Sequence, residues 1–367
     1  MRLAVISHAS VVGSNRRKLE ELSNARDIDL LLVLPARWKN RDIGVVLRAD
    51  PPKETSHATM IIAAWLNGFG SLFIFSPFRL FTTLQRFRPD VIYVEEEPWG
   101  LAALEASIIG RILQKRVVFF TWDNLGTKLP WLQRLIRRLV MRSADAAVAG
   151  NKEARRLLLN RRFAKPIAVI PQLGVDPQQS TREISDRLGH RFVVGYVGRL
   201  VWQKGIMLLL DAVARIPSAF VMIVGRGPLV PSLVSHANEL GIGKRIRFVH
   251  GVAHQEVSAY LPTMSALVLP SLTTAEWKEQ FGHVLIEAMA AGVPVVGSDS
   301  GAIPEVIGDA GIVFKEGDVE GLTAALRRLK DEPNLHDVLR ARGLARVRKE
   351  FTNKVLARKL HQFLSSI

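Results

Sequence analysis

The chain has 367 residues, of which 48% are hydrophobic, and this is enough for two domains of ordinary size rather than one. It has no cysteine, which excludes disulfides and cysteine-rich metal sites and suits a reducing compartment. The formal net charge is +16, of which residues 1–178 carry +11. Such an excess can indicate nucleic acid, an anionic lipid or an acidic substrate, but no recognisable nucleic-acid module accompanies it. The first residues predict a strand, because their apolar run is too short for a signal peptide.

Short apolar runs alternate with helical patterns along the whole chain. They predict strands at 2–7, 30–35, 91–94, 116–121, 146–149 and 167–170, and again at 192–197, 220–224, 246–250, 266–269, 294–297 and 312–314. Near-continuous Val, Ile and Leu runs separated by helices indicate parallel sheets buried on both faces. The pattern therefore predicts an α/β protein with two doubly wound, Rossmann-like domains. Ligands are expected beyond the carboxyl ends of the strands, in a cleft between the domains.

Polar side chains end two of the strands predicted in the first half. His8 ends the first strand, and the run Glu95 to Glu97 ends the third. A lone histidine is usually structural, but His8 could reach the cleft, and one of the glutamates, such as Glu97, could orient an acceptor. A metal site is the rival interpretation of the glutamates, although no His or Asp lies at ligand spacing. The Asp27-Ile-Asp29 sequence falls in a turn at the opposite edge of the sheet, so we expect no catalytic metal.

Two segments of the first half suggest a membrane surface. Residues 58–78 carry no charge, and as a helix they would span about 31 Å, but polar residues, glycines and Pro77 interrupt them. We therefore expect a buried helix followed by an apolar loop, or an interfacial segment. Residues 130–142 place Arg134, Arg138 and Arg142 at four-residue spacing with leucines on the other side, which suits anionic headgroups. The commoner alternative is a solvated face opposite a core face.

A loop rich in glycine and cations follows the strand predicted at 192–197. Arg199 offers a planar fork for phosphate oxygens, and Lys204 offers a point charge. Gly198 and Gly205 permit tight turns and close approach of the backbone. On its own this pattern is weak, because two solvated cations are the commoner case.

A second motif, EQFGHVLIEAMAAGVPVV, sets Glu279 and Glu287 eight residues apart. Glu279 falls in the loop after a predicted strand, and Phe281 and Gly282 are predicted to open a helix that contains Glu287. A helix start suits a phosphate, and carboxylates on each side can accept hydrogen bonds from sugar hydroxyls. Together these features describe a nucleotide-sugar site, with an ordinary βα unit as the alternative.

The two motifs, in this order, make the chain resemble the family-4 retaining glycosyltransferases of the GT-B fold. The matching stretches include VIPQLGVD, GYVGRLVWQKG, IVGRGP and RFVHGVA, and together they cover residues 170 to 314. The resemblance implies an acceptor-side domain over 1–178, joined by a C-terminal helix at about 352–367, and a nucleotide-sugar domain over 190–350. The polar stretch 177–190 is the predicted linker.

The resemblance also assigns roles to residues of the second half. Arg199 and Lys204 would stabilise the leaving diphosphate with the N–H groups near Phe281, Gly282 and His283. Glu279 would hold the donor sugar, and Glu287 the ribose. The remaining donor-site residues would line the pocket for the phosphates and the base: Gly198, Gly225, Arg226, Gly227, His250, Gly251 and Val252.

In the first half the resemblance is looser. Gly13 lies in the loop that would approach the donor diphosphate, although paired glycines are common there and a plain βα turn is the alternative. Many relatives carry a histidine next to the reacting sugar, and here Trp122 takes its place, followed by Asp123 and Asn124. Asp123 could bind the acceptor or a sugar hydroxyl, while Trp122 could stack on a sugar face or simply pack in the core.

We therefore predict a retaining, metal-independent glycosyltransferase that uses a nucleoside-diphosphate sugar as co-substrate and no cofactor. Its acceptor would be a glycan or lipid-linked molecule of polysaccharide or lipopolysaccharide synthesis. The protein would be cytoplasmic and peripheral on an anionic inner-membrane face. The alternatives are a nucleotide-sugar epimerase of GT-B shape, for which no clear acid/base set is seen, and a non-enzymatic polyanion-binding protein.

Overall fold

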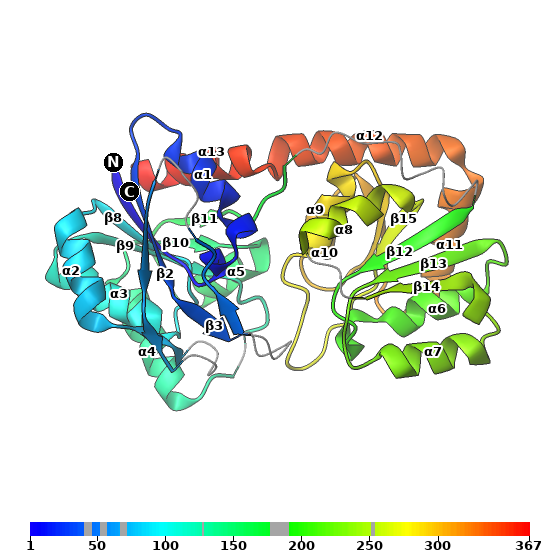
Figure 1. The fold of residues 1–367 in the computed structure, drawn as a ribbon, viewed down its shortest axis with the longest axis horizontal. Helices are drawn as coiled ribbons and strands as arrows, with labels where there is room; N and C mark the ends of the chain where they lie inside the picture. Colours follow the sequence, from blue (N-terminus) through cyan, green and yellow to red (C-terminus); the bar gives the residue numbers. More distant parts are fainter. Residues whose placement is uncertain (40–45, 52–56, 67–71, 127, 177–190, 251–253) are drawn as a thin grey trace. The chain divides into compact units, whose positions relative to one another are not determined.

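The computed structural model describes residues 1–39, 46–51, 57–66, 72–126, 128–176, 191–250 and 254–367. The chain divides into two compact units (Figure 1). Unit 1 comprises Met1–Gly174 and Asn353–Ile367, and unit 2 comprises Val175–Thr352. The linker predicted at 177–190 lies outside the described residues.

Unit 1 is built on a seven-stranded parallel sheet with the strand order β11-β10-β9-β8-β1-β2-β5. The strands are β1 Arg2–Ile6, β2 Asp29–Pro35, β5 Ala58–Ile62, β8 Val91–Val94, β9 Arg116–Thr121, β10 Ala146–Ala149 and β11 Ile167–Val169. Two short antiparallel pairs accompany the sheet: β3 Arg37–Lys39 with β4 Val46–Arg48, and β6 Ala64–Trp65 with β7 Ile74–Phe75.

Helices bury both faces of this sheet, as its nearly continuous apolar strands require. One face packs against α2 Pro77–Phe87, α3 Leu101–Ile112, α4 Trp131–Ser143 and α5 Lys152–Asn160. The other packs against α1 Arg17–Ser23 and α13 Asn353–Ser365. Leu356, Leu360 and Leu364 of α13 are fully buried there, so the last helix completes the core of unit 1.

Unit 2 has a six-stranded parallel sheet with the order β14-β13-β12-β15-β16-β17. Its strands are β12 Phe192–Val197, β13 Ala219–Val224, β14 Ile246–Val249, β15 Ala266–Leu269, β16 Val295–Ser298 and β17 Gly311–Phe314. Its helices are α6 Ile206–Ala214, α7 Val230–Glu239, α8 His254–Tyr260, α9 His283–Ala290, α10 Ile303–Ile307, α11 Val319–Asp331 and α12 Pro333–Glu350.

Every strand that the sequence predicts is present, and the α/β class is confirmed. The helix predicted in the first part of residues 58–78 is wrong, because Ala58–Ile62 forms edge strand β5, paired with β2, and β6 and β7 follow. Pairing with β2 satisfies the backbone of Ala58–Ile62, so this part of the apolar stretch is a strand rather than a helix. Among the helices of the described ranges, none is both long and apolar enough to cross a bilayer.

Candidate functional site

The charged residues predicted for the site of unit 2 lie where its strand order reverses, between β12 and β15. This position is called the switch point of the sheet. These neighbouring strands leave the sheet in the same direction, so the loops after them meet at one edge. Lys204 follows β12 and Glu279 follows β15, and Lys204 Nζ lies 2.6 Å from Glu279 Oε2. Both side chains are largely buried. The structure therefore brings together two predicted site residues that are 75 positions apart.

Two residues that the sequence motifs do not single out hold this ion pair. Ser271 Oγ donates a hydrogen bond of 2.8 Å to Glu279 Oε2, and Lys204 Nζ lies 4.7 Å from the centre of the Trp277 ring. Ser271 lies two residues after the end of the buried strand β15, and this position is the only sequence signal that could have found it. The carboxylate of Glu279 is thus fixed by a cation and by a hydroxyl.

Glycines let the backbone of these loops pack closely. A Cβ atom on Gly205 would lie 2.0 Å from the carbonyl oxygen of Pro270, and one on Gly301 would lie 2.0 Å from that of Glu279. Both glycines have left-handed backbones, with φ of 65° and 57°. No other residue meets both conditions without strain. The loops that carry Lys204 and Glu279 are therefore held by main-chain contacts.

The loops after β12 and β13 are also hydrogen-bonded and closely packed against each other. Gly198 N donates to Val224 O, and a Cβ on Gly225 would lie only 1.9 Å from Gly198 O. Tyr196 Oη donates a 2.8 Å hydrogen bond to the carbonyl oxygen of Arg199. Burial, and secondarily the charge of Glu279, raises the pKa of Tyr196 well above 10, so this phenol stays neutral. Tyr196 thus fixes the Arg199 backbone, a role the motifs did not reveal.

The remaining predicted donor residues of this edge lie on the same interlocked loops. Leu200 N donates to Arg226 O at 2.9 Å, and Gly227 passes so close that a Cβ would meet Leu200 O at 2.3 Å. The ring of His250 stacks on Phe248, with its Nδ1 3.3 Å from Gly225 O. Gly251 and Val252 lie outside the described residues.

Helix α9 begins at His283, two residues later than predicted. Gly282 has a φ of 77°, a left-handed backbone that cannot belong to the helix, and it forms the N-cap after Phe281. Inside the helix, His283 Nδ1 lies 3.2 Å from Glu287 Oε1, one turn apart. The positive end of the helix dipole and Glu287 therefore belong to the same short element.

Unit 1 has its own reversal of strand order, between β1 and β8. His8 follows β1 and Glu96 follows β8, and His8 Nδ1 lies 2.6 Å from Glu96 Oε2. Burial lowers the pKa of His8, but the charge and hydrogen bond of Glu96, aided by Glu95 and Glu97, outweigh this effect and raise the pKa above 6.5. The ring of His8 also contacts those of Trp38 and Phe73. His8 is thus part of a charged pair at the switch point.

The three glutamates that end β8 have separate partners. Glu95 forms a fully buried ion pair with Lys18, 2.7 Å long, and also accepts from Gln172 Nε2 at 3.4 Å. The three glutamates are adjacent in sequence, but they do not act as one cluster. Glu95 pairs with Lys18 of α1, and Glu96 pairs with His8 after β1.

Glu97 lies against the segment that follows β9. Its carboxyl group accepts from Thr121 Oγ1 at 2.6 Å and from the backbone N–H of Trp122 at 2.8 Å. Burial raises its pKa to about 8, against the opposing effect of these two hydrogen bonds. Glu97 therefore fixes the start of the Trp122–Asn124 segment, and its proton can exchange near neutral pH.

The Trp122–Asn124 segment is itself firmly packed. Trp122 covers Gly150, where a Cβ would lie 2.1 Å from the indole ring, and its Nε1 donates to Gln172 Oε1 at 3.1 Å. Asp123 is buried and lies 2.7 Å from Arg161 Nη2. Asn124 is buried as well.

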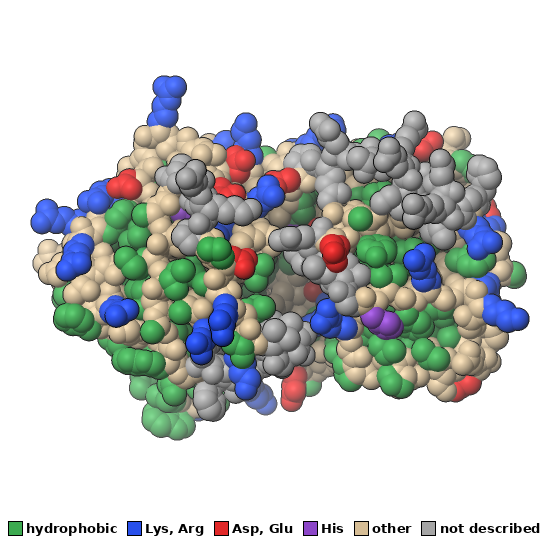
Figure 2. Space-filling view, in the orientation of Figure 1, with side chains coloured by type: hydrophobic (Ala, Val, Ile, Leu, Met, Phe, Trp, Pro, Cys, Tyr) green, Lys and Arg blue, Asp and Glu red, His purple; other side chains and the backbone are tan. Residues whose placement is uncertain are grey.

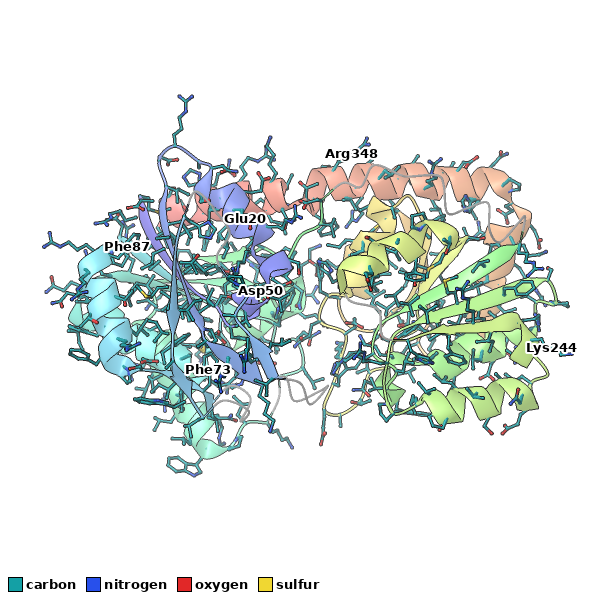
Figure 3. The ribbon with its side chains drawn as sticks, viewed as in Figure 1. Glu20, Asp50, Phe73, Phe87, Lys244 and Arg348 are labelled. Carbon is teal, nitrogen blue, oxygen red and sulfur yellow. The ribbon has the colours of Figure 1, made fainter. Side chains whose placement is uncertain are left out.

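Gly13 lies in the loop after β1, as expected, but a carboxylate reaches its amide. Gly13 N donates to Asp50 Oδ2 at 2.6 Å, and a Cβ would approach the same oxygen at 3.0 Å. Figure 3 labels Asp50 in unit 1. Sequence reasoning missed this residue, since 37 positions separate it from its partner.

No group of three or more His, Cys, Asp or Glu is arranged to hold a metal ion in the described ranges. The described residues of each unit thus place charged side chains at a switch point. Such an arrangement is typical of enzymes and binding proteins for polar ligands.

Comparison with known proteins identifies the class. Residues 177–346 match the family Glycosyl transferases group 1, and residues 21–172 match the Glycosyl transferase 4-like domain. A mannosyltransferase of Mycolicibacterium smegmatis, GDP-mannose-dependent and specific by name for phosphatidylinositol monomannoside, is 29% identical over 65% of this chain and 68% of its own length. The lipopolysaccharide core biosynthesis glycosyltransferase LpsD of Rhizobium meliloti is 33% identical over 45% of this chain and 47% of its own.

Among solved structures, that of Anabaena Alr3699/HepE in complex with UDP covers 100% of both chains with a TM-score of 0.76 and 18% identity. This similarity confirms the two-domain, Rossmann-like GT-B fold. The two family matches together cover most of the chain, and the protein is a GT-B glycosyltransferase, an enzyme of glycosyl transfer.

Proposed function

We propose that this enzyme is a retaining, metal-independent glycosyltransferase that moves a sugar from a nucleoside-diphosphate sugar to a glycan or lipid-linked acceptor. The observation that carries the proposal is the Lys204–Glu279 pair at the switch point of unit 2, 2.6 Å long. A cation beside a hydroxyl-accepting carboxylate matches the two halves of such a donor, its diphosphate and its sugar. The HepE structures with UDP and with UDP-glucose support a donor of this class.

In the proposed step, the bond between the anomeric carbon and the diphosphate oxygen breaks, and negative charge collects on the leaving diphosphate. Arg199 and Lys204 stabilise that charge, together with the positive end of α9. Fixed cations of this kind supply electrostatic stabilisation without a metal. Retention of configuration rests on the family resemblance.

Glu279 can exchange partners as the donor binds. Ser271 keeps its hydrogen bond to Oε2 when Lys204 turns toward the diphosphate. The remaining lone pairs of the carboxylate then accept from hydroxyls of the donor sugar. On α9, Glu287 takes the ribose hydroxyls, and His250 with the Gly225–Gly227 loop lines the base pocket.

The acceptor belongs, in this proposal, to the switch point of unit 1. His8 and Glu97 follow adjacent strands there, and Glu97 has a pKa raised to about 8, which suits a group that exchanges protons near neutral pH. The names of the mannosyltransferase and of LpsD support an acceptor from glycolipid or lipopolysaccharide synthesis. Trp122 and Asp123 serve this site by holding its backbone, because both side chains have partners within unit 1.

We also propose that the protein is cytoplasmic and attaches peripherally to the inner face of the membrane through α4. This helix leaves Trp131, Leu135 and Leu139 exposed beside its arginines, so it lacks the fully covered apolar face of an ordinary surface helix. Co-sedimentation with anionic and neutral vesicles across a salt series tests this attachment. Release by salt is expected, and absence of binding to either lipid would contradict it.

The enzymatic proposal is tested by screening the purified protein against nucleoside diphosphates and their sugars by thermal shift. The best donor is then used to measure sugar transfer and release of the nucleoside diphosphate, with and without EDTA. Stabilisation by one nucleoside diphosphate and chelator-resistant turnover are expected. Loss of all turnover with EDTA would contradict the metal-independent mechanism.

A further inference from the structure

A pocket of about 690 Å³ lies on unit 1, between α4 and the turn that joins α5 to β11. None of the donor or acceptor roles above uses it. Seven of the ten residues that line it are cations, namely Arg134, Arg137, Arg138, Arg142, Arg161, Arg162 and Lys165. The other three are Met141, Phe163 and Ala164, so no carboxylate is among the described residues of the lining.

One guanidinium nitrogen of this pocket has no acceptor among the described residues. Arg137 Nη1 is buried without a hydrogen-bond partner in the described part of the chain. Burial and the nearby charges of Arg161 and Arg134 lower the pKa of Arg137, although Asp123 opposes them. Asp123 is already paired with Arg161 at 2.7 Å. A buried guanidinium N–H without an acceptor is costly, so an anionic acceptor from outside the chain is the simplest complement.

The walls of the pocket are held in place by contacts within unit 1. Lys165 Nζ donates to the carbonyl oxygens of Arg142 and Ala144, which ties the turn after α5 to the end of α4. Phe163 of this turn is buried and contacts the ring of Phe119. The two segments that carry the arginines are therefore held against each other.

The chemistry of the lining suits a phosphate group. Guanidinium groups donate in pairs to phosphate oxygens, and several of them around one space match a group with more than one negative charge. The volume exceeds that of a bare phosphate ion and leaves room for a headgroup.

The surface next to the pocket is apolar, and this argues for a lipid. Arg134, Arg138 and Arg142 form one row along α4, and the row three residues earlier contains Trp131, Leu135 and Leu139. The side chains of this apolar row are 70%, 45% and 45% exposed. Figure 2 shows hydrophobic side chains interspersed with Lys and Arg on the face of unit 1 that is in view.

We propose that the α4–α5 pocket binds the phosphate monoester or diphosphate headgroup of a membrane lipid, while Trp131, Leu135 and Leu139 insert among the acyl chains. The inference rests on the proposed membrane attachment and makes it selective. The enzyme would recognise one class of headgroup rather than negative charge in general.

The test compares vesicles of equal surface charge that contain either phosphatidic acid, a phosphate monoester, or phosphatidylserine. Full-length protein should bind phosphatidic acid vesicles more tightly in co-sedimentation. Arg137→Gln should weaken that binding about tenfold and abolish the preference, because it removes the buried, unpartnered donor. Arg155→Gln is the matched control, since Arg155 is an exposed arginine of α5 that does not line the pocket.

Further experiments distinguish a lipid ligand of the pocket from a soluble anion. Leu135→Ser with Leu139→Ser should weaken binding to phosphatidic acid vesicles while leaving the affinity for free pyrophosphate unchanged. Pyrophosphate binding that is lost in Arg137→Gln, without vesicle binding by the wild type, would overturn the lipid assignment. Equal binding to both vesicle types, with equal effects of Arg137→Gln and Arg155→Gln, would overturn the pocket itself.

Further measurements control for unfolding of the variants and for effects on the donor site. The thermal unfolding midpoint checks that each variant is folded, and Arg137→Lys, which keeps a cation but not the planar fork, should show an intermediate affinity for phosphatidic acid. Affinity for the nucleoside diphosphate, which unit 2 is proposed to bind, should stay unchanged in Arg137→Gln. Failure of the pocket and failure of the donor site are therefore distinguishable.

Discussion

At the switch point of unit 2, the loops after the strands contain glycines with positive φ, whereas the corresponding loops of unit 1 are filled with charged side chains. The unit 2 glycines are Gly198, Gly205, Gly225, Gly282 and Gly301. In unit 1, Lys18, His8 and the carboxyl groups of Glu95, Glu96 and Glu97 occupy the equivalent edge.

The comparison teaches how one topology can serve two kinds of recognition. Loops cleared of side chains let the backbone approach a ligand closely, which suits a constant group such as a diphosphate. Loops filled with partnered side chains offer specific hydrogen bonds, which suit a ligand whose hydroxyl pattern must be distinguished. Each prediction below tests one side of this difference.

The largest effect is expected from the cations of unit 2. Arg199→Ala and Lys204→Ala should each lower turnover about 100- to 1000-fold, because one preorganised charge contributes roughly 3–4 kcal/mol to the barrier. Steady-state kinetics measure this loss. The control is Lys244→Ala, an exposed lysine labelled in Figure 3 that precedes β14 and so lies at the opposite edge of the sheet.

Lys204→Ala also removes a cation from beside the buried carboxylate of Glu279, which costs stability. The double variant Lys204→Met with Glu279→Gln should regain thermal stability without regaining turnover. Restored turnover in this double variant would show that the pair is structural.

Replacing glycines should lower the free energy of unfolding more in unit 2 than in unit 1. Gly205→Ala and Gly225→Ala put a Cβ within 2.0 Å of a carbonyl oxygen at positive φ, so each should cost about 2–3 kcal/mol. Gly13→Ala in unit 1 should cost less than about 1 kcal/mol, because its Cβ meets only the Asp50 side chain at 3.0 Å. Denaturant unfolding measures the free energy of unfolding of each variant. Equal losses of stability in the two units would contradict the difference between their loops.

Unit 1 should make stability depend on pH. The pKa of Glu97 rises from 4.5 to about 8 through burial, and that of His8 is raised by Glu96 despite burial. The folded state then binds more protons than the unfolded state, so the free energy of unfolding falls as pH rises. For Glu97 this fall runs from pH 4.5 to about 8, at up to about 1.4 kcal/mol per pH unit.

Thermal unfolding of Glu97→Gln across this range checks the prediction. The variant should show a flatter dependence than the wild type, with the two curves converging at low pH, where Glu97 is protonated, and diverging as pH rises. Parallel curves would mean that Glu97 is ionised throughout.

The smallest effect distinguishes the two glutamates of unit 2. Glu287→Ala should weaken nucleoside diphosphate binding about tenfold, since the ribose is part of that ligand. Glu279→Ala should leave this affinity nearly unchanged and reduce sugar transfer instead. Calorimetric titration with the nucleoside diphosphate alone measures the affinity of each variant. An equal loss of affinity in both variants would show that the roles of Glu279 and Glu287 are wrongly assigned.

The sequence predicted the strands because they have local signals, and it drew attention to Lys204 and Glu279, which the structure places side by side, for the same reason. Apolar runs mark buried strands, and Lys204 and Glu279 stand in short glycine-bearing motifs. What it could not predict depends on distant partners. Asp50 on Gly13, Gln172 on Trp122 and Lys18 on Glu95 join positions that no local pattern connects.

The error at residues 58–78 has the same origin. An uncharged run fits a helix or a strand equally well by composition, and only its pairing with β2 decides between them. On α4 the arginine spacing was predicted, but the exposure of Leu135 and Leu139 was not, because it depends on which face α3 and the sheet cover.

The placement of α13 in unit 1 has a consequence for the order of synthesis. Residues 353–367 supply Leu356, Leu360 and Leu364 to the core of unit 1, yet they leave the ribosome only after the whole of unit 2. Unit 2 is contiguous in the chain and can fold as soon as it emerges, whereas unit 1 waits with part of its apolar surface uncovered. The domain that starts first during translation is therefore the one that finishes last, and nascent chains stalled before residue 353 should expose that surface to chaperones.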